Sequence, residues 1–120
     1  MAKSVVSIVK SPEKPDEKQI EAAVRKAIEL VGGLKDIISR GDTAIIKPNL
    51  VIPQAPEIGT TTDPRVCKAI ADMVKEIGGR PVIAEASAVG IDTEEAFKAA
   101  GEALLESKRN GGNAVTIAGA

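Results

Sequence analysis

Polar residues with useful chemistry follow two apolar runs of this sequence. Lys47 and Asn49 come directly after the first run. Glu85 and Ser87 lie at the end of the second. A lysine ammonium binds anions, an asparagine amide donates and accepts hydrogen bonds, and a carboxylate serves as a general base or a metal ligand. A long loop between the two runs returns the chain to four further polar residues: Thr60, Thr61, Thr62 and Asp63.

The start of the helix expected at Pro64 predicts an anion site. The first amides of a helix have no intrahelical partner and carry the positive end of its dipole, which suits a phosphate or a carboxylate. Lys47 would add a full positive charge, and the threonine hydroxyls would add donors. The alternative is that Thr62 or Asp63 simply caps the helix, and an aspartate there would oppose an anion.

The other candidates have structural alternatives too. Lys47 can reach solvent and Asn49 can bond turn backbone, although Pro48 between them fixes the backbone and so favours recognition. Glu85 can be a solvated strand-end carboxylate. Ser87 has no histidine partner in the chain, which excludes a serine-hydrolase role of the usual kind. Replacement of Lys47 is expected to change the fold little, because a strand-end lysine buries mainly its stem.

The composition removes several classes of function. The chain has 120 residues, a net charge of -1, no histidine, and Phe97 as its one aromatic residue. It therefore lacks the basic surplus and the stacking rings of nucleic-acid binders, and it has no histidine metal site. Cys67 is the only cysteine, so this chain holds no iron–sulfur cluster by itself, and a buried small hydrophobe is the simplest interpretation of that thiol.

No apolar run is long enough for a signal peptide or a membrane span, so a cytoplasmic protein without a membrane partner is expected. The glycine-rich phosphate-binding fingerprints are also missing. The expected partner is a small anionic molecule, and an unpartnered edge strand would leave homo-oligomer formation open.

The hydrophobic pattern alternates between strands and helices. Four short β-rich runs predict strands at 4–9, 43–46, 81–86 and 114–118. Helical periodicity predicts helices from about 16 to 31, from 64 to 77 and from 92 to 108. This order indicates an α/β fold: a small three-layer domain with a mainly parallel sheet of about four strands and helices on both faces.

In such sheets ligands bind at the carboxyl ends of the strands, where the polar candidates converge together with Lys10 and Ser11. Two organisations stay open for residues 1–120: a single α/β domain, or the N-terminal part of a longer one.

The region from 45 to 79 resembles the family catalogued as domain of unknown function 362. The family hallmark is an apolar strand ending in Lys-Pro-Asn, a loop with proline, and Gly-x-Thr-Thr-Asp-Pro before a helix. The resemblance covers roughly residues 4 to 100. The matching residues are Lys47, Pro48, Asn49, Gly59, Thr61, Thr62, Asp63 and Pro64.

The resemblance implies a fold and a shared pocket but no established reaction. Many family members are longer and carry a four-cysteine ferredoxin-like iron–sulfur module, which this chain lacks. The favoured hypothesis is a small-ligand-binding domain with an anion site at the strand ends. The alternatives are an enzyme or redox-associated protein in which Glu85 and Asp63 act on the ligand or a metal, and a truncated domain without activity of its own. No catalytic residue is assigned.

Overall fold

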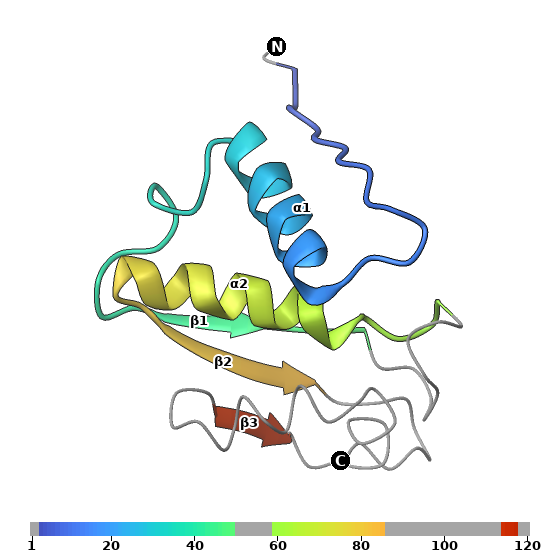
Figure 1. The fold of residues 1–120 in the computed structure, drawn as a ribbon. Helices are drawn as coiled ribbons and strands as arrows, with labels where there is room; N and C mark the ends of the chain where they lie inside the picture. The colour runs from blue at the N-terminus through green and yellow to red at the C-terminus, as the bar shows by residue number, and fades with distance from the viewer. Residues whose placement is uncertain (1–2, 50–58, 86–113, 118–120) are drawn as a thin grey trace.

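The computed structural model describes residues 3–49, 59–85 and 114–117. Within them the chain forms two helices and three strands, shown in Figure 1. The elements are α1 (Glu17–Leu30), β1 (Thr43–Ile46), α2 (Pro64–Ile77), β2 (Arg80–Glu85) and β3 (Ala114–Ile117).

The strands form a parallel sheet in the order β1-β2-β3. Ile46 of β1 lies opposite Ile83 of β2, and Glu85 of β2 lies opposite Ile117 of β3. Because the strands are parallel, their carboxyl ends meet at one edge, as the alternation of elements predicted. The α/β class is therefore confirmed.

The predicted first strand is not formed in this structure. Residues 4–9 are described but run as extended chain without a partner strand, so the described sheet has three strands rather than four. Val6 and Ile8 are 79% and 90% exposed, and Ser7 Oγ donates a hydrogen bond to the Ala27 carbonyl of α1 at 2.7 Å. A β-branched run becomes a strand only where it packs on a sheet, and this one lies along α1 instead.

Both described helices lie on the same side of the sheet (Figure 1). α2 packs on β1 and β2, and α1 packs on α2 as an outer layer. α2 lies on one face of the sheet because it is the crossover between the parallel strands β1 and β2, whereas α1 precedes β1 and lies on that side through its packing on α2. Helices on both faces are therefore not confirmed, and the helix expected at 92–108 lies outside the described residues.

Local signals in the sequence explain where each helix begins and ends. Asp16 and Gln19 form a capping box at the start of α1, in which each side chain accepts the other residue's backbone N–H. Asp63 caps α2, and Pro64 occupies its first turn. Gly78 ends α2 with φ of 89°, a left-handed conformation that favours glycine.

The core of the described residues is aliphatic and small. It lies between α1, α2 and β2. Arg25 of α1 ties the helices together from outside, with Nη2 at 2.6 Å and Nη1 at 2.9 Å from the Glu76 carboxylate of α2. The buried apolar residues of the described chain are Ile20, Cys67, Ala69, Ala71, Met73, Val74 and Ile83, together with Pro48, Pro64 and Pro81.

Candidate functional site

An ion pair joins the ends of β1 and β2. Lys47 follows the last residue of β1, and its Nζ lies 2.7 Å from Oε2 of Glu85, the last residue of β2. The Lys47 side chain is 70% exposed, whereas that of Glu85 is 6% exposed. An ammonium has three donors, so the contact with Glu85 anchors Lys47 and leaves two donors for other partners. The structure thus brings together two of the three charged candidates, Lys47 and Glu85.

Asn49 closes the long loop that follows β1. Its backbone N–H donates to Thr62 Oγ1 at 2.7 Å, and its carbonyl accepts from the Thr62 N–H at 2.9 Å. Its side-chain amide donates to the Thr60 carbonyl at 2.8 Å. Asn49 therefore bonds backbone, which was the structural alternative for this residue, and it holds the threonines next to the end of β1.

Thr61 is the candidate with the least satisfied side chain. The residue is 5% exposed, and its Oγ1 has no hydrogen-bond partner within the described part of the chain. A buried hydroxyl without a partner costs about 1–3 kcal/mol. Such a group marks a place where a hydrogen-bond partner from outside the described residues would be stabilising.

Asp63 and Arg65 occupy the start of α2. Asp63 Oδ1 accepts the Arg65 backbone N–H at 2.9 Å, and Arg65 Nη2 lies 2.7 Å from Asp63 Oδ2. Arg65 Nη1 also donates to the Pro15 carbonyl at 2.9 Å, which ties the entry of α1 to α2. The capping interpretation of Asp63 is confirmed, so the first turn of α2 already holds a carboxylate from within the chain.

The hydrogen bond from the Arg65 side chain is the main reason that the pKa of Asp63 lies below its ordinary value of 3.8, and burial opposes this shift. A carboxylate with a lowered folded pKa stabilises the fold above its ordinary pKa, and this contribution is lost as pH falls through the folded pKa. Arg65 itself was not predicted as part of the site. An arginine two residues after an aspartate N-cap is the signal that indicates it.

We expect Asp63→Asn to remove the part of the stability loss at low pH that comes from protonation of Asp63. Asparagine still caps the helix, so at pH 7 the variant loses only the ion pair, a change of about 0.5 kcal/mol. Asp63→Ala, the matched control, loses the cap as well as the ion pair, and its free energy of unfolding should fall by about 1.5 kcal/mol. Urea unfolding between pH 7 and pH 3 measures both. A wild-type stability loss below pH 4 that Asp63→Asn fully retains would contradict the role of this carboxylate.

The described residues hold no group of three or more histidine, cysteine, aspartate or glutamate side chains that could bind a metal ion. In the same part of the chain, no helix has the length and apolarity needed to cross a membrane. Ser87 lies outside the described residues, so its place relative to Lys47 is not described.

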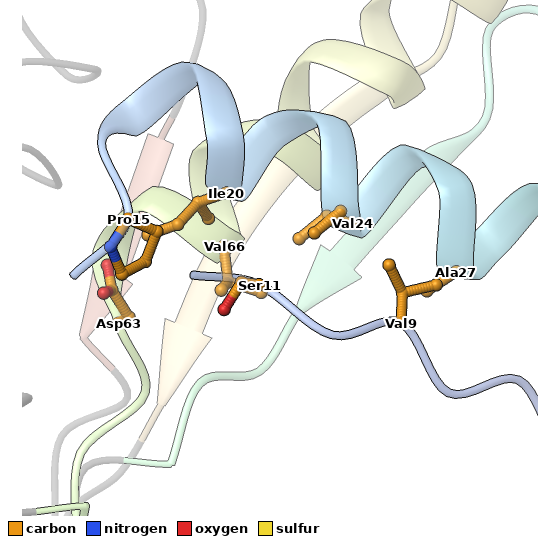
Figure 2. A pocket seen from close by; sticks show the side chains of 9 residues that line it. Val9, Ser11, Pro15, Ile20, Val24, Ala27, Asp63 and Val66 are labelled. Atoms are coloured by element: carbon orange, nitrogen blue, oxygen red, sulfur yellow. The ribbon is translucent and has the colours of Figure 1, made fainter. Parts of the chain in front are cut away.

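A cavity of about 350 Å³ lies between the N-terminal segment, α1 and the start of α2 (Figure 2). The sequence did not predict it. Its walls are aliphatic apart from Ser11 and Asp63, and Asp63 is the one predicted site residue among them. The lining residues are Val9, Ser11, Pro15, Ile20, Ala23, Val24, Ala27, Asp63 and Val66.

A family model described as Domain of unknown function (DUF362) matches residues 45–118, a range that contains every predicted site residue. The thylakoid-associated protein sll1697 of Synechocystis is 35% identical to this chain over 69 residues. That match covers 58% of this chain and 22% of the relative, so the chain spans about a fifth of the relative's length. No solved structure matches the chain.

Proposed function

The chain belongs to the family described as Domain of unknown function (DUF362), and we propose that it binds a small anionic ligand at the carboxyl ends of its strands. The ligand is a phosphate or a carboxylate. The observation that carries the proposal is the exposed Lys47 ammonium, anchored on the buried Glu85 carboxylate at 2.7 Å. One donor of the ammonium is used in this contact, and two can meet a ligand.

The neighbouring residues support a site of this kind. Glu85 fixes the ammonium in place, which lowers the entropy that a ligand must remove on binding. The negative charge of Glu85 also partly cancels the positive potential of Lys47 at longer range. The site therefore favours an anion whose oxygen atoms accept hydrogen bonds directly from the ammonium over an anion held only by long-range attraction. Thr62 is hydrogen-bonded to Asn49, two residues after Lys47. The buried Thr61 hydroxyl belongs to the residue next to Thr62 and so lies in the same part of the chain.

We expect inorganic phosphate or acetate to shift the amide resonances of residues 60–65 in a saturable way. Lys47→Gln should weaken this binding by about 1.5–3 kcal/mol, or roughly 10- to 150-fold, the scale of a charge-assisted hydrogen bond. Lys18→Gln removes a charge from the exposed face of α1 and serves as the matched control. Equal shifts in Lys47→Gln and the wild type would contradict the proposal.

A second variant separates binding from folding. Lys47→Gln leaves Glu85 without its ammonium partner, so a weaker response could reflect a loosened strand edge. The double variant Lys47→Gln/Glu85→Gln keeps a neutral hydrogen-bonding pair of similar shape. Its amide spectrum should stay native while phosphate binding is lost, because the pair is still hydrogen-bonded but no ammonium remains to bind the anion. Native binding in this double variant would assign the ligand to other residues.

A further inference from the structure

The outer edge of β1 is open in the described sheet. β1 pairs with β2 on one side, and none of the described strands pairs with it on the other. Ile45 in the middle of β1 is 70% exposed. An edge of this kind presents unpaired N–H and C=O groups together with an apolar side chain, and it is a template for one more strand.

The segment 4–9 has what such a strand needs. Its sequence, SVVSIV, is rich in β-branched residues, and Val5, Val6 and Ile8 are 71%, 79% and 90% exposed. No backbone hydrogen bond joins this segment to the rest of the described chain. Its anchors along α1 are the bond from Ser7 Oγ to the Ala27 carbonyl and the contact of Val9 with the cavity of Figure 2. Three large apolar side chains therefore remain in water.

The position of α1 fits a strand at the open edge. The Arg65–Pro15 contact places the entry of α1 beside the start of α2, which begins near the carboxyl ends of the strands. A parallel strand beside β1 would end at that same edge. A right-handed crossover from it to β1 would place α1 on the same side as α2, which is where α1 lies (Figure 1). The linker 10–16, at roughly 3.3 Å per residue, reaches about 23 Å.

We infer that residues 4–9 move between two places: the groove along α1 seen in this structure, and the open edge of β1, where they form a parallel fourth strand. Docking at β1 buries apolar surface that is exposed along α1. It also gives hydrogen-bond partners to the backbone N–H and C=O groups at the edge of β1 that no described strand pairs with. It also carries Lys10 and Ser11 to the edge that holds Lys47. The same movement opens the cavity that Val9 and Ser11 line.

Amide hydrogen exchange of the ligand-free protein tests the inference without any reference to anion binding. Alternate amides of residues 4–9 should exchange at least tenfold more slowly than in an unstructured peptide, because a ladder partner protects them. Val5→Pro and Ile8→Pro remove N–H groups that point in opposite directions in a strand, so one of the two variants removes a ladder donor and should abolish this protection. Along α1 the Ile8 side chain is 90% exposed and its backbone is unpaired, so the groove arrangement tolerates the same change. Lys3→Pro, outside the segment, is the control.

Three outcomes would overturn the inference. Exchange at the free-peptide rate in the wild type would show that the segment does not dock on β1. Protection that survives both Val5→Pro and Ile8→Pro would assign it to the groove along α1. Protection that grows with protein concentration would assign the β1 edge to a second copy rather than to the same chain.

Discussion

Lys47→Met is expected to lower the free energy of unfolding by about 1.5–3 kcal/mol, the scale of losing a hydrogen bond to a charged group. Methionine keeps much of the apolar stem and removes the ammonium. The cost arises at Glu85, whose side chain is 6% exposed and loses the contact at 2.7 Å that compensates its burial. Urea unfolding at pH 7 measures the change. This expectation differs from the one drawn from the sequence, in which replacement of Lys47 changes the fold little because a strand-end lysine buries mainly its stem.

Two controls identify Glu85 as the origin of the effect. The double variant Lys47→Met/Glu85→Met should recover much of the lost stability, because the buried carboxylate is removed together with the ammonium that lies against it. Lys18→Met removes an exposed lysine from α1 and should change stability by less than about 0.5 kcal/mol. If Lys47→Met unfolds at the wild-type midpoint, the ion pair contributes nothing measurable, and Lys47 is a solvated lysine as the structural alternative had it.

The periodicity of the sequence predicted the elements that bury their side chains. α2 spans the predicted residues 64–77, because its apolar face, its aspartate cap and its closing glycine all indicate the same bounds. β1 matches its prediction as well, and β2 begins one residue earlier than expected. The segment 4–9 has an equally clear β-rich composition, yet it is not a strand here. Composition shows that a segment can pair, but whether it does depends on a neighbouring strand that local sequence does not contain.

The site was predicted in part, for a similar reason. The parallel order required the ends of β1 and β2 to meet at one edge, so Lys47 and Glu85 were both chosen as candidates. Their contact with each other was not predicted, because it depends on the register of the two strands and on the lysine rotamer. Likewise, the bonds from Asn49 to Thr60 and Thr62 depend on how the loop closes, which residue types alone do not determine.

Cys67 is expected to be about a hundredfold less reactive toward iodoacetamide in the folded protein at pH 8 than a thiol of ordinary pKa. It lies in α2 at 2% exposure, and burial, followed by the charge of Asp63, raises the pKa of its thiol from 9.0 to about 11. Since the thiolate is the nucleophile, two pKa units reduce its population about a hundredfold at pH 8. The rate of carbamidomethylation, followed by mass spectrometry with and without denaturant, measures this.

The result bears on the redox alternative for this chain. A redox-active or nucleophilic cysteine needs a lowered pKa and access to solvent, and Cys67 has neither, even though it lies near the start of a helix. Asp63→Asn is the matched control: it removes the smaller cause of the shift, so the rate should rise slightly while burial still holds the pKa above 9.0. A carbamidomethylation rate in the native protein equal to that in denaturant would mean that α2 opens readily around Cys67. The thiol would then again be a candidate for a redox or nucleophilic role.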